Sequence, residues 1–390
     1  MLALDGGGIR GAVSLGFLGR IERLLRDRYG NPDFRLRDYF DLIGGTSTGS
    51  IIAAALAVGM EVAEIQENYR TLGPAVFSRK SHHIHRLEAW FDAGRLEAEL
   101  ARHLGEMTLG DDAITTGLCI VAKRADTRST WPLINHPGGR FYAENRTIPL
   151  RKVVRASTAA PALFRPEALR VGQAEVGAFV DGGVSMANNP SLLLLLVATL
   201  RGFPFHWETG EDRLLLTSIG TGTWSQALPA DTVLNRKVWS WALEVPSMLI
   251  ADAGLQAQLL LQALSRSPTP WPIDAEMGDL TGDVLGGSPL LHYLRFDGLL
   301  ETESLQKLDL GHLTPKLAQL RDMANGAGVD DLLVVGEASA EAQVAESHFP
   351  AVFDVASQPE GPGYSTGTRS PSDTSSPEPS SETSPSHPSS

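Results

Sequence analysis

Two stretches of the chain share one pattern, in which a short apolar run enters a glycine-rich turn and a helix follows. Residues 2–4 lead into the turn "DGGGIRG" and then into a helix predicted to end near Tyr29. Residues 39–45 lead into "TSTGS" and the apolar stretch "IIAAALAVGM". Two strand-turn-helix units in succession predict parallel strands covered by helices, because parallel neighbours need a crossover connection. The chain is therefore expected to be an α/β protein.

The composition limits the partners that this chain can have. Hydrophobic residues make up 42% of its 390 residues, which is enough for a sizeable core. A formal net charge of -13 argues against a nucleic-acid partner and leaves no broad basic surface for an anionic membrane. The single cysteine, Cys119, cannot form an internal disulfide, and its apolar run "GLCIVAK" is expected to be a buried strand.

No segment has the features of an export signal or a membrane anchor. The N-terminus lacks a basic stretch followed by a long apolar run. The longest apolar runs, "LLLLLVATL" and "IIAAALAVGM", are shorter than the roughly 18 residues that cross a bilayer. A cytoplasmic protein is expected, in which any contact with a membrane surface is local and transient.

Composition and motifs divide the chain into three parts. The glycine-rich motifs lie within residues 1–200, which are predicted to form the catalytic core. Residues 201–355 are expected to complete the sheet and to add a helical C-terminal extension packed on the core. Residues 356–390 are rich in Ser and Pro and have too few apolar residues to offset the entropy of ordering, so a disordered tail is predicted.

The segment "GTSTG" matches the G-x-S-x-G nucleophile elbow and has the context that this pattern requires, a strand before it and a helix after it. Gly45 and Gly49 leave room for a strained turn in which a larger side chain would clash. Ser47 would then present its hydroxyl at the head of a helix, whose positive end favours developing negative charge. These features predict that Ser47 is a catalytic nucleophile.

A serine hydroxyl needs a neighbouring base to take its proton. In an ordinary α/β-hydrolase this base is a histidine far downstream, so a histidine-dependent esterase is one alternative. Five histidines follow Asp181, all in segments without a distinctive setting: His206, His292, His312, His348 and His387. Asp181 ends the apolar run "AFVD" before Gly182, and a partly desolvated carboxylate there could accept the proton directly. Because strand ends of one parallel sheet share an edge, a Ser47–Asp181 dyad is predicted.

The opening motif matches the dinucleotide-binding spacing, with glycines at Gly6, Gly8 and Gly11. A dinucleotide site would require an acidic residue at the end of the second strand, where this chain has a serine turn. The backbone amides of Gly6, Gly7 and Gly8 are instead predicted to form an oxyanion hole. Arg10 could brace this loop or attract an anionic head group. A nucleotide-binding or sensing protein is the alternative outside the enzymes.

Three motifs in this order resemble the patatin-like phospholipase family: "DGGGIRG" at residues 5–11, "GTSTG" at 45–49 and "DGG" at 181–183. The stretch "ASTAAPALF" before the aspartate is also similar to that family, and the resemblance covers about residues 1–200. One departure is that the first motif lies almost at Met1, whereas the family commonly has a few more residues in its first strand.

The resemblance implies a three-layer α/β/α sandwich with a central, mostly parallel sheet. It implies hydrolysis of acyl esters of phospholipids or other lipids, with Ser47 as nucleophile, Asp181 as its base and the amides of Gly6 to Gly8 as oxyanion donors. No metal or cofactor is expected. An acyltransferase and an effector phospholipase switched on by a nucleotide are alternatives within the same fold. The segment "PAVFSRKSHHIH", residues 74–85, could be a lid or a contact with the lipid surface.

Overall fold

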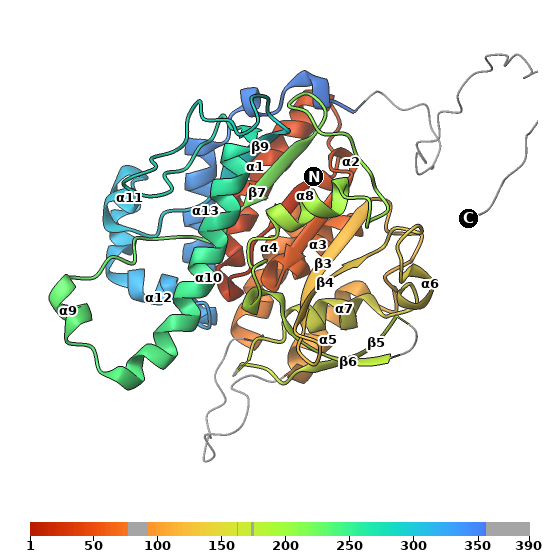
Figure 1. Ribbon diagram of the computed structural model, residues 1–390, viewed down its shortest axis with the longest axis horizontal. Helices are drawn as coiled ribbons and strands as arrows, with labels where there is room; N and C mark the ends of the chain where they lie inside the picture. The colour runs from red at the N-terminus through yellow and green to blue at the C-terminus, as the bar shows by residue number, and fades with distance from the viewer. Residues whose placement is uncertain (77–92, 162, 173–174, 356–390) are drawn as a thin grey trace, which may run out of the picture. The chain divides into compact units, whose positions relative to one another are not determined.

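The computed structural model describes residues 1–76, 93–161, 163–172 and 175–355. Within these residues the centre is a nine-stranded sheet in the order β5-β6-β3-β2-β1-β7-β9-β8, with β4 paired to β3 (Figure 1). The strands are β1 (Leu2–Leu4), β2 (Leu42–Thr46), β3 (Gly117–Arg124), β4 (Ser129–Ile134), β5 (Glu167–Val171), β6 (Glu175–Asp181), β7 (Leu215–Ile219), β8 (Ser265–Arg266) and β9 (Leu291–Phe296). β4, β5 and β6 pair antiparallel, and all other pairs are parallel.

Helices cover both faces of this sheet. Along β1, Leu2 and Leu4 join one hydrophobic cluster while Met1 and Ala3 join another, because successive strand residues point to opposite faces. Helices α1, α3, α4 and α13 contribute to the first cluster, and α8 and the end of α10 contribute to the second. The described helices are α1 (Gly11–Tyr29), α2 (Leu36–Tyr39), α3 (Thr48–Ala57), α4 (Val62–Val76), α5 (Ala93–Leu104), α6 (Tyr142–Asn145), α7 (Leu150–Ser157), α8 (Ser191–Thr199), α9 (Ala230–Leu234), α10 (Val238–Ala263), α11 (Thr302–Lys307), α12 (Leu317–Arg321) and α13 (Val329–Gln343). The predicted α/β/α sandwich with a mostly parallel sheet is confirmed, as are the helices that follow it.

The part of the chain after residue 200 shares its core with the N-terminal motifs. β7 pairs with β1, and β9 and β8 extend the sheet beyond it. α13 packs along α1, where a Cβ added to Gly16 would lie 2.2 Å from the backbone of Gly336. A side chain at this point would force the two helices apart, so α13 is closely fitted to the first helix of the chain.

Two predicted features lie outside the described residues. One is the Ser- and Pro-rich tail, and the other is most of the candidate lid at residues 74–85. Within the described residues, no helix combines the length and the apolar character needed to cross a membrane.

Candidate active site

Ser47 occupies a tight turn between β2 and α3. Its backbone has φ 54° and ψ −123°, a conformation that residues with a side chain rarely adopt. Its neighbours must be small, because a Cβ on Gly45 would lie 2.1 Å from the carbonyl oxygen of Gly49. A Cβ on Gly49 would lie 2.2 Å from the carbonyl oxygen of Leu4. The turn places Ser47 at the N-cap position of α3.

The turn is fixed to β3 through α7. The Ser47 N–H donates to Ser157 Oγ at 2.9 Å. The hydroxyl of Ser157, which is fully buried, donates in turn to the carbonyl of Val121 at 2.6 Å. The serine turn is therefore attached to the strand that also pairs with β6.

Asp181 lies directly opposite the serine hydroxyl. Ser47 Oγ donates a hydrogen bond of 2.6 Å to Asp181 Oδ2, and the Gly183 N–H donates to Oδ1 at 2.7 Å. Burial raises the pKa of Asp181 to about 6, although the hydrogen bonds from Ser47 and Gly183 and the charge of Arg155 lower it in part. At neutral pH this carboxylate is ionised and lies within reach of the serine proton.

The two residues meet because β2 and β6 approach each other end to end beside β3. β4 lies along one side of β3, so β2 and β6 share the other side. Thr46, which ends β2, pairs with Val121, and Asp181, which ends β6, pairs with the next residue, Ala122. The expectation that both residues end strands of one parallel sheet is wrong, because β6 is antiparallel to β3. Two strands that run toward each other bring their carboxyl ends together.

The glycine loop lies beside this pair, and its amides are not equivalent. The Gly6 N–H donates to the carbonyl oxygen of Asn188 at 3.0 Å and is already paired. Within the described residues, no hydrogen bond engages the Gly7 or Gly8 N–H groups. Three amides were predicted as oxyanion donors. Of these, the Gly7 and Gly8 N–H groups remain free to donate, whereas the Gly6 N–H does not. Gly8 has φ 60°, which favours glycine at this position.

Asn188 connects the glycine loop to the segment after Asp181. Its Nδ2 donates to the carbonyl of Gly6 at 3.4 Å. Its Oδ1 would lie 2.4 Å from a Cβ on Gly6 and 2.7 Å from a Cβ on Gly183. No sequence motif predicted a role for Asn188, and the available signal was the pair of asparagines in "NNP".

Arg10 braces the loop from the other side. Its Nη1 donates to the carbonyl of Gly222 at 3.0 Å, and its guanidinium lies 5.0 Å from the ring of Trp224. The side chain is buried, and desolvation lowers its pKa. Of the two functions considered for Arg10, these contacts support bracing.

A buried ion network holds the base of the glycine loop. Arg295 Nη2 donates to Asp5 Oδ2 at 2.8 Å and to Asp297 Oδ2 at 3.0 Å, and its Nη1 donates to Ser218 Oγ at 2.8 Å. Asp297 Oδ1 accepts the N–H of Gly222, the residue that Arg10 contacts. Burial raises the pKa of Asp5 to about 6 despite the charge of Arg295. The sequence analysis found no motif in this region, although charged residues at the end of the apolar run "LLHYLRFD" were the available signal.

The described part of the chain offers no support for a metal site or for a histidine base. Within it, no group of three or more His, Cys, Asp or Glu side chains is arranged to hold a metal ion. No histidine there forms a hydrogen bond with Ser47 or Asp181. His82, His83 and His85 lie outside the described residues.

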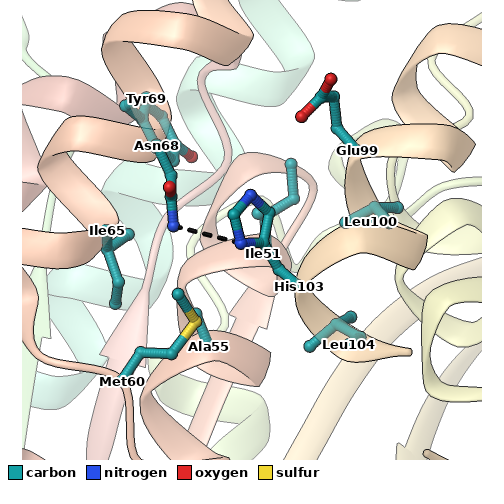
Figure 2. Close-up of a pocket in the computed structure, with 10 residues that line it drawn as sticks. All are labelled: Ile51, Ala55, Met60, Ile65, Asn68, Tyr69, Glu99, Leu100, His103 and Leu104. Atoms are coloured by element: carbon teal, nitrogen blue, oxygen red, sulfur yellow. Dashed lines mark hydrogen bonds between the residues drawn. The ribbon is translucent and has the colours of Figure 1, made fainter. Parts of the chain in front are cut away.

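A pocket lies beside α3 (Figure 2). Its lining begins at Ile51, one helical turn after Ser47. Its apolar walls come from α3, α4, α5 and the turn before α4, namely Ile51, Ala55, Met60, Ile65, Leu100 and Leu104. Asn68 and His103 bridge α4 and α5 at 3.4 Å between Nδ2 and Nδ1. Tyr69, which also lines the pocket, shares a hydrogen bond with Thr48, the residue after the serine. The pocket wall and the serine turn are therefore in contact.

An α/β/α sandwich with a serine on a strand-to-helix elbow is the arrangement typical of serine ester hydrolases. Comparisons with known proteins identify the class of this enzyme more closely. The model of the patatin-like phospholipase family matches residues 2–195. Patatin-17 of Solanum cardiophyllum is 29% identical over 280 residues, which cover 67% of this chain and 71% of that protein. A cGAMP-activated phospholipase of Escherichia coli (strain TW11681) is 27% identical over 278 residues, covering 68% of this chain and 76% of that protein.

Among solved structures, the match to VipD from Legionella pneumophila covers 82% of this chain and 66% of the VipD chain. The TM-score of 0.34 and the identity of 15% are too low to support a conclusion about the fold. The family model and the curated relatives agree on one assignment. Residues 2–195 form a patatin-like phospholipase domain, and the protein is an enzyme that hydrolyses lipid acyl esters.

Proposed function

We propose that this enzyme releases fatty acids from membrane phospholipids, as a phospholipase A does, through a Ser47–Asp181 dyad. The observation that carries the proposal is the 2.6 Å hydrogen bond from Ser47 Oγ to Asp181 Oδ2. Asp181 takes the hydroxyl proton as Oγ attacks the ester carbonyl, and it returns this proton to the departing alcohol oxygen. Water then attacks the acyl-enzyme, losing a proton to Asp181, and the fatty acid leaves as Ser47 regains its proton.

The developing oxyanion requires donors that are already in place. In this proposal they are the N–H groups of Gly7 and Gly8. The pairing of the Gly6 N–H with Asn188 and the hydrogen bond from Thr221 Oγ1 to the Gly6 carbonyl, at 3.1 Å, hold the start of the loop. The N-terminal end of α3, which begins at the residue after Ser47, adds a favourable partial positive charge.

A fluorophosphonate probe tests both the nucleophile and its base. The probe is expected to attach to Ser47, and the labelling rate is expected to rise with pH around a midpoint near 6. Below that pH the carboxyl of Asp181, whose pKa is raised by burial, is protonated and cannot accept the serine proton. Peptide mass spectrometry identifies the labelled residue. Ser47→Ala serves as the unlabelled control, and labelling elsewhere or at a constant rate between pH 5 and 8 would disprove the dyad.

The pocket beside α3 is proposed to bind the fatty-acyl chain. Ile51 and Ala55 follow Ser47 at intervals of one turn, so the strip from Ser47 to Ala55 is about 12 Å long. Carbon bonds of about 1.5 Å span this distance with roughly eight to ten carbon atoms. Each methylene group that the pocket removes from water should raise kcat/KM by about four-fold.

Filling the pocket should therefore change chain-length preference. Ala55→Phe is expected to lower kcat/KM for p-nitrophenyl decanoate by about ten-fold or more and to leave the butyrate within about two-fold of wild type, because only the longer chain reaches the new ring. Ala98→Phe, on the exposed side of α5, is the matched control. An equal loss for both esters would show that Ala55→Phe disturbs the fold and does not block an acyl site.

A further inference from the structure

The N-terminal half of α10 carries large apolar side chains that the described part of the chain leaves exposed to solvent. Val238 is 88% exposed and Leu249 is 61% exposed, and Leu234 at the end of α9 is 80% exposed. From Ala253 onward one face of the same helix is packed, with Ala253 and Ala257 buried. We define the exposed set as the apolar ridge, which comprises Leu234, Val238, Val245, Met248 and Leu249.

In sequence, the apolar ridge comes shortly after a strand that ends at the catalytic edge of the sheet. β7 is parallel to β1 and pairs with it, so β7 leaves the sheet at the edge where the glycine loop begins. Arg10 contacts Gly222 and Trp224 in the segment after β7, which ties this segment to the glycine loop. α9 and the start of α10 come next and extend away from the sheet (Figure 1).

Other exposed apolar side chains lie close to the dyad and the glycine loop. Val184 and Met186, just after Asp181, are 42% and 65% exposed. Met323, whose carbonyl accepts the Ile9 N–H of the glycine loop, is 45% exposed. Clusters of exposed apolar side chains are typical of binding sites, because water contact with apolar surface is unfavourable.

We propose that the apolar ridge inserts into the surface of a lipid bilayer and brings the catalytic edge to its substrate. This inference rests on the proposed function, since the ester bond of a membrane phospholipid lies at the depth that interfacial helices reach. Trp241 lies on the same half of α10, and the guanidinium of Arg236 lies 5.3 Å from the centre of its ring. Tryptophan is enriched at membrane interfaces. The ridge therefore has both apolar side chains and an interfacial anchor.

The charges near the ridge indicate how it binds. Residues 228–252 contain two basic and three acidic side chains, so this segment has no excess of positive charge. Binding is therefore expected to depend on apolar insertion, with little requirement for anionic lipid and little sensitivity to salt. This differs from a contact through the basic segment at residues 74–85, which was considered from the sequence.

Co-sedimentation with phosphatidylcholine vesicles tests the proposal. The double variant Val238→Asp/Leu249→Asp is expected to bind at least about ten-fold more weakly than wild type, because each large apolar side chain lost from the bilayer weakens binding by about ten-fold or more. The matched control is Val352→Asp, because Val352 is 57% exposed. The nearby Val355 N–H donates to the hydroxyl of Tyr29, which ends α1 on the side opposite to the glycine loop. This variant should bind as wild type does. All three proteins should hydrolyse soluble p-nitrophenyl butyrate equally.

The outcomes separate this inference from the proposed function. Ser47→Ala should bind the vesicles as wild type does and release no fatty acid, so hydrolysis by this variant would disprove the dyad without affecting the ridge. Equal vesicle binding by wild type and the double variant, or no binding by wild type, would overturn the ridge. Light scattering that shows a wild-type dimer and a monomeric double variant would overturn it too, because the ridge would then bind a second copy of the chain.

Discussion

Replacing Asp181 with asparagine is expected to lower kcat/KM for acyl esters by about 10²–10⁴-fold, which is the usual effect of a general base. Asparagine has nearly the same shape and can still accept the Gly183 N–H, but it cannot take the proton of Ser47. Steady-state kinetics with p-nitrophenyl butyrate measures the loss. Ser47→Ala should cost at least as much, and the double variant should be no worse than Ser47→Ala, because residues that act as a unit are not additive.

The same asparagine should stabilise the fold at neutral pH. The pKa of Asp181 rises from its ordinary value of 3.8 to about 6 on folding, so between these values the folded state binds more protons than the unfolded state. Stability therefore falls as pH rises through this range, and the ionised carboxylate costs up to about 3 kcal/mol above it. Urea unfolding should show Asp181→Asn to be more stable than wild type at pH 8 and equal to it below pH 4. A variant that loses activity together with stability at pH 8 would contradict this account.

Removing Arg295 is expected to destabilise the enzyme by about 3–5 kcal/mol, because Asp5 and Asp297 would be left buried without their cation. The variant is Arg295→Met, which keeps an unbranched side chain about as long as the stem of arginine and removes the guanidinium group. Like-charge repulsion would raise the pKa of Asp5 further, so the loss should be largest at high pH and smallest in acid. Chemical denaturation across pH measures the effect.

Two further variants make this prediction specific. Arg295→Met/Asp5→Asn should recover part of the lost stability, because one of the two buried charges is gone. Arg213→Met removes an exposed ion pair with Glu208 and should change stability by less than about 1 kcal/mol. A loss of less than about 1 kcal/mol for Arg295→Met would show that the network does not support the glycine loop.

The local patterns were sufficient to predict the fold class and the strand-turn-helix arrangement around Ser47. A G-x-S-x-G sequence between an apolar strand and an apolar helix has few ways to pack, and β2, Ser47 and α3 have this arrangement. The direction of β6 was not predictable in the same way, because strand pairing depends on contacts between residues far apart in sequence. One reason for predicting Asp181 as the base, that it ends a strand of a parallel sheet, is therefore wrong, because β6 is antiparallel to β3.

Long-range contacts also explain what the sequence left out. Asn188 and Arg295 contact the glycine loop from 182 and 290 residues away, and neither belongs to a local motif. The hydrogen bond of the Gly6 N–H likewise depends on the backbone carbonyl of Asn188. The glycine-rich sequence gives no indication of this distant partner. The exposure of the apolar ridge could not be read from α10, because an apolar helix of this kind is more often buried.

Fatty-acid release from mixed phospholipid vesicles, with a chelator present, tests the central claim most directly. Wild-type enzyme and Ser47→Ala are compared after each has been shown to be folded. The proposed dyad predicts release by wild type and none by Ser47→Ala. Equal release by both proteins would contradict the proposal that Ser47 is the nucleophile, and no release by either would contradict the proposal that phospholipids are the substrate of this enzyme as it stands.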